Sequence, residues 1–508
     1  MKQRWIKWAL AAGAGTLVVL LGLFFWYARP SKITQMVRDG AAERLDLDVT
    51  IDHVEVHLLP RPAVSGRGVA LRLPGRPDLP PFVAIDEFRV NIGLLSLVRK
   101  RVDTVYAKGL HIAVPPSEAR DGLPGGRSGE PSEVVINHFV TEDGSLQFVP
   151  SDPAKQPLTF AIHDLDVWNV GVGLAMPFEA TLTNPVPEGL VRAEGEVGPF
   201  VKGEVPHSAV SGEYTFEDAN LATINGIGGT LQSTGTFSGT IQRIAVTGQA
   251  HVPDFSLDLG GRPLPLEADF DAVVTGTNGT TVLERVDAVL HETPMVVTGA
   301  VINQPGPGNR ALEFDVTIDD GRIEDILALV IDSEQPVMTG RLAVDAHMKL
   351  PPGDTPVRDR LEVDGRFGLN ESRFTDSGVQ SKMVTLSRRS SGRNGDDEAP
   401  PAESVLTDLS GRVRLADGVA RLTTIRFQVP GALVALDGTY GLQSGALDFE
   451  GELRMQASVS EAIGGFKSFF LRPFNPLFRK EGAGAVVPIR IEGTRNEPKF
   501  GVRWGEVF

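Results

Sequence analysis

The feature that most constrains this chain is an apolar residue at every second position. Residues 342–350 read Leu-Ala-Val-Asp-Ala-His-Met-Lys-Leu, and similar alternation returns from about residue 50 to the carboxyl end. A period of two predicts β-strands with one apolar and one polar face. Few stretches with helical periodicity are present to cover so much sheet. The apolar faces must therefore pack against each other or against something that is not protein.

Composition narrows the class of protein. A chain of 508 residues exceeds one ordinary domain, so we expect several domains or one sheet that grows by adding strands. The net charge of −16 and the lack of a basic stripe disfavour a nucleic-acid partner, because phosphate binding depends on clustered Lys and Arg. With no cysteine, the chain has no disulfide, thiolate nucleophile or cysteine-bound zinc.

The amino terminus predicts a membrane anchor. Residues 9–27 form an uncharged run of 19 residues, long enough to cross a bilayer core as a helix. The short basic tail of residues 1–8 predicts a cytoplasmic amino end, with the bulk of the chain on the other side. A cleaved signal peptide is the alternative, but no small-x-small cleavage site follows the run. The aromatic residues expected at the membrane interface are Trp5, Trp8, Trp26 and Tyr27.

Turn and loop signals predict how the rest of the chain is divided. Breaks at intervals of about ten to fifteen residues favour antiparallel meanders over βαβ units. Two polar stretches without periodicity predict flexible segments. The expected parts are a β module at 28–114, a flexible loop at 115–133, a central β region at 134–386, a flexible insertion at 387–404, a β segment at 405–458, an amphipathic helix at 459–481 and terminal strands at 482–508.

The amphipathic segment at 459–481 mixes aromatic and basic residues. This composition is typical of a membrane interface, where rings lie at headgroup depth and cations meet anionic lipid. The alternative is a helix that caps the open end of the sheet. The interface candidates in this segment are Phe466, Phe469, Phe470, Phe474 and Phe478.

Catalytic motifs are absent from the sequence. His53, Glu55 and His57 would project from one face of a strand about 6.6 Å apart, which fits either metal ligands or an ordinary polar face, and we favour the polar face. Asp319 and Asp320 precede a short predicted helix and are better placed to serve its amino terminus than to bind calcium. We therefore expect a protein that is not an enzyme and has no cofactor, metal site or catalytic residue.

Several segments in their order along the chain resemble the AsmA-like family of bacterial envelope proteins. The resemblance rests on the membrane anchor, Gly66-Arg67-Gly68-Val69-Ala70-Leu71, Gly109-Leu110-His111-Ile112, the region from Phe270 to Gly299, Asp320 to Leu327, and Val487 to Thr494. It implies a long, twisted, folded-over antiparallel sheet with an elongated apolar groove, held in the inner membrane with its bulk in the periplasm. The family is related to TamB-like proteins and bridge-like lipid transfer proteins.

The resemblance and the alternation together predict the function. An apolar groove would bind phospholipid acyl chains and conduct them between membranes, with the inner membrane, a second membrane at segment 459–481 and envelope proteins as partners, and no nucleic acid. The alternatives are a filled β-sandwich core and, for function, a structural or assembly scaffold of the envelope or outer membrane. The predicted groove residues are Leu312, Phe314, Val316, Ile318, Leu342, Val344, Met348, Leu447, Phe449 and Leu453.

Overall fold

The structure is a computed structural model. It describes residues 48–502, except for 58–61, 74, 92–100, 116–134, 151–156, 172, 200–206, 225, 277–278, 304–309, 337, 354, 376–406, 430–431, 456–485 and 495–496. The predicted membrane helix at 9–27, the amphipathic segment at 459–481 and the insertion at 387–404 lie outside the described residues, as does the loop at 115–133 apart from its first residue. Among the described helices, none has the length and apolar character needed to cross a membrane.

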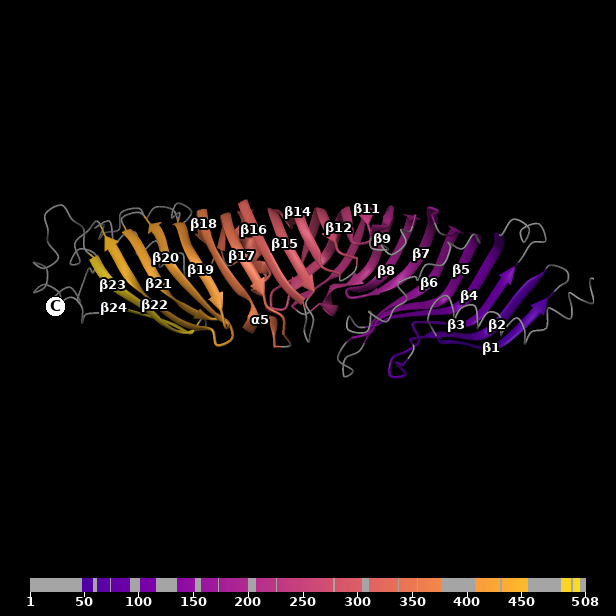
Figure 1. Ribbon diagram of the computed structural model, residues 1–508. Helices are drawn as coiled ribbons and strands as arrows, with labels where there is room; N and C mark the ends of the chain where they lie inside the picture. The colour runs from indigo at the N-terminus through magenta and orange to yellow at the C-terminus, as the bar shows by residue number, and fades with distance from the viewer. Residues whose placement is uncertain are drawn as a thin grey trace, which may run out of the picture. The chain divides into compact units, whose positions relative to one another are not determined.

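The predicted mainly β architecture is confirmed. Among the described residues, twenty-four strands belong to one open sheet, and successive strands run side by side (Figure 1). The described residues add only two helices, α4 (Ile323–Ala328) and α5 (Val357–Arg360), and one 3-10 turn, η3 (Leu221–Thr223). The first of these helices is the short one predicted from the sequence.

The chain divides into two compact units within β9 and β11. Unit 1 comprises Met1–Phe216 and Thr236–Gln242, and unit 2 comprises Glu217–Gly235 and Arg243–Phe508. Unit 1 contains β1 (Asp48–His57), β2 (Ala63–Arg72), β3 (Val83–Asn91), β4 (Arg101–Val114), β5 (Val135–Phe148), β6 (Leu158–Val170), β7 (Met176–Pro185), β8 (Glu188–Val197), most of β9 (Ala209–Asn220) and the end of β11 (Thr230–Thr240).

Unit 2 contains the remainder of β9 and β11 and all later strands. These are β10 (Ile227–Gly228), β12 (Arg243–Leu257), β13 (Leu264–Val274), β14 (Thr281–Leu290), β15 (Thr293–Asn303), β16 (Arg310–Arg322), β17 (Met338–Leu350), β18 (Glu362–Phe374), β19 (Thr407–Ala416), β20 (Val419–Val429), β21 (Ala432–Gly441), β22 (Ala446–Met455), β23 (Val486–Thr494) and β24 (Pro498–Val502).

The strand pairs of the described residues are antiparallel, as predicted, with one exception. From β12 to β24 each strand pairs antiparallel with the next. The exception is β4 and β5, which pair in parallel. Twenty residues, 115–134, connect these two strands, and a parallel pair needs a crossover of about a dozen residues or more. The predicted antiparallel pairing is therefore wrong at this connection, and the short β10 departs from a simple meander because it pairs with β12.

Register shifts recur along unit 2. One lies between Ile318 and Gly321 of β16, and another lies between Leu422 and Ile425 of β20. Similar shifts interrupt the pairing of β13 with β14, β14 with β15, β17 with β18, and β18 with β19. A bulge adds one residue to one strand and bends it, so these irregularities curve the strands of unit 2.

Candidate functional site

One face of unit 2 is apolar across successive strands. Met348 of β17 lies opposite Phe314 of β16 and Val363 of β18, and Val344 lies opposite Ile318 and Phe367. Because side chains alternate between the two sides of a strand, residues that pair across strands share a face. This set of residues is called the apolar face below.

The same face continues to the carboxyl-terminal strands. Leu453 of β22 lies opposite Val434 of β21 and Val487 of β23. Phe449 lies opposite Ile491 in the same way. Following the register from β16 to β23 therefore places all ten predicted groove residues on the apolar face, although β22 is distant in sequence from β16 and β17.

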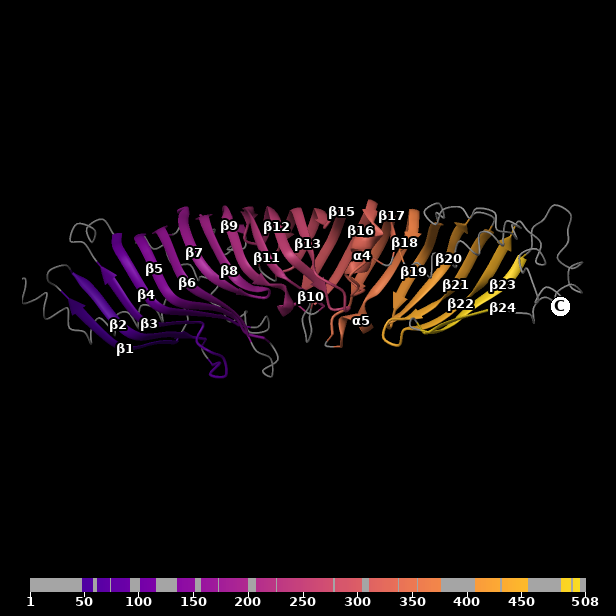
Figure 2. The same cartoon turned by 180° about the vertical axis from the view of Figure 1, so that it is seen from behind.

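The ten residues fall into two groups by exposure. Leu342 is 3% exposed and Ile318 is 4% exposed. Both belong to a cluster against which Ile323, Ile326 and Leu327 of α4 pack, and Figure 2 shows α4 beside β16 and β17. The other eight are half-buried. Helix α4 therefore covers one part of the apolar face. Leu342 and Ile318 form a protein core there, and Val316 and Val344 pack against it.

A polar cluster holds α4 in place. Asp325 of α4 is 4% exposed. Its carboxylate accepts hydrogen bonds from the Thr293 hydroxyl at 2.8 Å and from the Glu292 backbone N–H at 3.2 Å, and its Oδ1 lies 3.1 Å from His291 Nδ1. These partners lie in the β14–β15 turn and at the start of β15. A buried carboxylate needs such partners, so the cluster fixes where the helix lies on the face.

The acidic pair before α4 has a different role from the predicted one. Asp320 makes an ion pair with Arg341 at 2.9 Å, and no side chain caps the amino terminus of α4. The acidic residues in the first turn are Glu324 and Asp325. They are the carboxylates that stabilise the positive end of the helix dipole, so the assignment of that role to Asp319 and Asp320 is wrong.

Glycines opposite phenylalanines shape the apolar face. A Cβ on Gly438 would lie 2.4 Å from Cδ1 of Phe449, and a Cβ on Gly411 would lie 2.9 Å from Cζ of Phe367. The aromatic ring thus occupies the space that a side chain on the neighbouring strand would need. Such glycines inside strand patterns are the available sequence signal, because they mark close approach of another group.

Unit 1 has an apolar face that the sequence candidates did not include. Val167 of β6 lies opposite Phe139 of β5 and Phe178 of β7. Leu165 lies opposite Thr141, which is 1% exposed and whose hydroxyl has no hydrogen-bond partner among the described residues. The alternation that identified the unit 2 residues is also present here and is the signal that would have found them.

The opposite face of unit 2 is polar and carries cross-strand ion pairs. Lys349 lies 3.2 Å from Glu313, and Arg414 lies 2.5 Å from Asp364. These groups are mostly exposed, so each pair contributes no more than about 1 kcal/mol to stability. The pairs keep this face solvated, in contrast to the apolar face.

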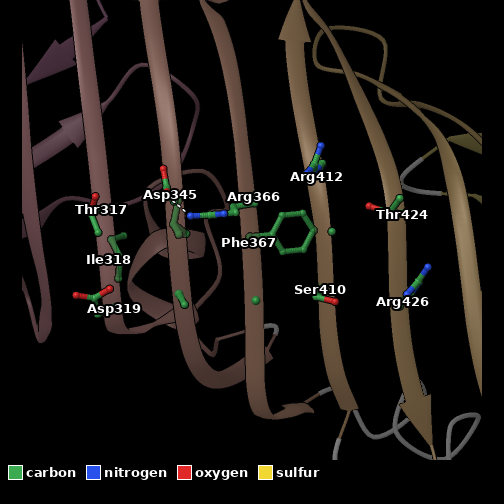
Figure 3. A pocket seen from close by; sticks show the side chains of 14 residues that line it. Thr317, Ile318, Asp319, Asp345, Arg366, Phe367, Ser410, Arg412, Thr424 and Arg426 are labelled. Atoms are coloured by element: carbon green, nitrogen blue, oxygen red, sulfur yellow. Dashed lines mark hydrogen bonds and ion pairs between the residues drawn. The ribbon is translucent and has the colours of Figure 1, made fainter.

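A hollow of about 670 Å³ lies in the polar face over β16 to β20 (Figure 3). Ala343, Gly368 and Ser410 lie side by side on three adjacent strands, and their small side chains leave the space open. Arg366, Arg412 and Arg426 are the cations at its wall. The sequence interpretation missed this hollow because the three arginines come together only through the strand register.

The histidine cluster at β1 is exposed. His53 Nε2 lies 3.1 Å from Glu55 Oε1, and His57 Nε2 lies 3.6 Å from Glu55 Oε2. The hydrogen bond and the charge interaction with His53 lower the pKa of Glu55. His57 also lies 3.0 Å from the Ser65 hydroxyl. Within the described ranges no group of three or more potential ligands could hold a metal ion.

The predicted membrane-interface residues lie outside the described part of the chain. This applies to Trp5, Trp8, Trp26 and Tyr27 at the amino end and to the five phenylalanines of segment 459–481. Comparison with known families finds no family model that matches the chain, and no curated protein matches it. The resemblance to AsmA-like proteins therefore stays a prediction.

Proposed function

We propose that the apolar face of this protein binds phospholipid acyl chains and conducts them along the sheet. The observation that carries the proposal is that eight of the ten predicted residues are half-buried on a single face. In a filled sandwich, side chains at such positions would pack against an opposing sheet and be buried. Over β19 to β23, the apolar cluster around Val434 and Leu436 contains strand residues alone and no described helix.

The energetics favour hydrocarbon as the occupant. Each methylene removed from water contributes about 0.8 kcal/mol. Moving a phospholipid with roughly thirty methylenes through water therefore costs on the order of 20 kcal/mol of free energy. A continuous apolar face lowers this barrier without any catalytic group. In unit 2 the face runs over thirteen strands, β12 to β24, and twelve spacings of about 4.8 Å give it an extent of roughly 58 Å.

The proposal includes a place in the cell. Segment 9–27 anchors the chain in the inner membrane of a two-membrane bacterium, and the β units lie in the periplasm. Segment 459–481 contacts a second membrane, so that lipid moves between the two and maintains the envelope. The support for this arrangement is the sequence pattern of these two segments and the resemblance to AsmA-like proteins.

Site-specific photocrosslinking in membranes tests the proposal. Phe449 and Glu450 are neighbours in β22 whose side chains lie on opposite faces. A photoreactive phenylalanine analogue at position 449 should form an adduct with phospholipid, identified by mass spectrometry, and the same analogue at position 450 should not. Full-length protein that forms no lipid adduct at position 449, and that retains no phospholipid when extracted from membranes, would instead support the scaffold function.

A further inference from the structure

The arginine hollow, defined by Arg366, Arg412, Arg426, Ser410 and Thr424, lies on the face opposite the apolar one. Its charges are not balanced. Arg366 makes an ion pair with Asp345 at 2.6 Å. For Arg412 and Arg426, no carboxylate among the described residues lies within the 4.0 Å of an ion pair. Two uncompensated guanidinium groups therefore remain in a protein whose net charge is −16.

Strand register brings these cations together. Arg366 of β18 lies directly opposite Arg412 of β19. Ser410 of β19 lies directly opposite Arg426 of β20. Like charges at directly opposite positions of an antiparallel pair are destabilising unless an anion lies between them. The lining carries three arginines against two aspartates, Asp319 and Asp345, so the hollow keeps a net positive charge, which attracts anions.

An unusual backbone conformation sets the position of Thr424 beside these residues. Thr424 has a φ of 51°, a left-handed conformation that is unusual for a β-branched residue. It lies in the register shift of β20, and its N–H donates to Asp437 Oδ1 at 2.7 Å. Conformations of this kind persist where the surrounding structure holds them, and they concentrate at functional sites. In Figure 3, Thr424 and Arg426 lie on β20 across from Ser410 and Arg412 on β19.

We propose that the arginine hollow binds the phosphate group of a phosphate ester. Arg412 and Arg426 approach the phosphate from two adjacent strands, and the hydroxyls of Ser410 and Thr424 donate to its remaining oxygens. A tetrahedral phosphate accepts bonds from several directions, whereas a planar carboxylate is satisfied by one bidentate arginine. The volume of about 670 Å³ also holds the organic part of the ester. Thr317 and Asp319, at the far wall, can bind hydroxyl groups of that part.

Two sources could present this chemistry, a soluble phosphate ester or the headgroup of a lipid at a membrane surface. Calorimetry with the full-length protein, titrated with glycerol 3-phosphate in low salt, measures the first. Calorimetry of the detergent-solubilised full-length protein with short-chain phosphatidylglycerol, compared with short-chain phosphatidylcholine, measures the second. The double variant Arg412→Gln/Arg426→Gln removes the charge and keeps hydrogen-bonding side chains. Arg454→Gln is the matched control, because Arg454 is paired with Glu452 at 3.0 Å outside the hollow.

The double variant should bind glycerol 3-phosphate at least about 100-fold more weakly than the wild type, since each charge-assisted contact is worth roughly tenfold or more. The control should bind like the wild type. Loss of the preference for phosphatidylglycerol over phosphatidylcholine in the double variant identifies the headgroup as the source. An unchanged preference, together with weakened binding of glycerol 3-phosphate, identifies the soluble ester. Wild-type protein that neither binds glycerol 3-phosphate nor prefers phosphatidylglycerol overturns the proposal, and so does a double variant that binds both ligands as tightly as the wild type. Lipid adducts at position 449 would be unaffected either way, so this test is separate from that of the proposed function.

Discussion

A single carboxylate on the apolar face gives the sharpest test of lipid binding. Met348 is half-buried, lies opposite Phe314 and Val363, and does not belong to the cluster beneath α4. Met348→Glu therefore introduces a charge where an acyl chain would pass, without removing a contact of the helix. In the unoccupied protein the new carboxylate remains hydrated, so we expect the variant to fold.

The cost to lipid binding follows from the chemistry of the carboxylate. An acyl chain that covers position 348 removes water from the group, and protonation is the least costly way to keep the site neutral. A glutamate has an ordinary pKa of about 4.3, which is roughly 2.7 units below pH 7. Protonating it at pH 7 therefore costs about 3.7 kcal/mol. This corresponds to a loss of roughly 500-fold in lipid affinity. The loss should largely disappear near pH 4.3, where protonation costs little.

The assay is the amount of phospholipid per mole of purified full-length protein, measured by mass spectrometry at pH 7 and at low pH. Met348→Leu keeps the volume and should retain lipid. Gln428→Glu adds the same charge on the polar face and should also retain lipid. If folded Met348→Glu protein carries as much phospholipid as the wild type at pH 7, the apolar face does not conduct acyl chains.

Three further predictions concern the fold. Leu342→Ala should destabilise unit 2 by about 2–5 kcal/mol, because it leaves a cavity beneath α4, and denaturant unfolding measures this loss. Gly438→Ala should also destabilise, since the new Cβ would lie 2.4 Å from Phe449 Cδ1, and thermal unfolding would show it. Arg285→Gln should raise the pKa of Asp287, which the hydrogen bond from Arg285 lowers. The stabilisation from that lowered pKa is fully present above the ordinary carboxyl pKa and is lost as the pH falls through the lowered pKa of folded Asp287. An NMR titration measures the pKa.

Each of these predictions has a control. Leu453→Ala removes a half-buried side chain with no helix from the described residues packed on it, and it should cost less than Leu342→Ala; equal losses would contradict the role of α4 as a cover. Gly501→Ala adds a Cβ with nothing within 4 Å and should leave stability unchanged. If Gly438→Ala is as stable as Gly501→Ala, the ring of Phe449 does not limit this position. If the pKa of Asp287 is unchanged in the Arg285→Gln variant, the hydrogen bond from Arg285 is not what lowers that pKa.

The strands and their two faces could be predicted from the sequence. Alternation identified β16, β17 and β22 correctly, and it assigned all ten groove candidates to what proves to be one face. The residues from Ile323 onward were also correctly interpreted as a short helix. These successes share a physical reason, which is that side-chain direction along a strand or a helix is a local property with a fixed period.

Tertiary structure decided which parts of each face are covered and which residues meet. Only the register places Phe449 over Gly438, brings Arg366 beside Arg412, and aligns β4 with β5 in parallel. Only the fold puts α4 on top of Leu342 while leaving Met348 half-buried. Such contacts join residues that are distant in sequence, and their partners are set by strand pairing, bulges and packing over the whole unit. A local periodicity contains no information about them, so the sequence alone determined the apolar face, and the tertiary structure determined which of its residues are buried and what covers them.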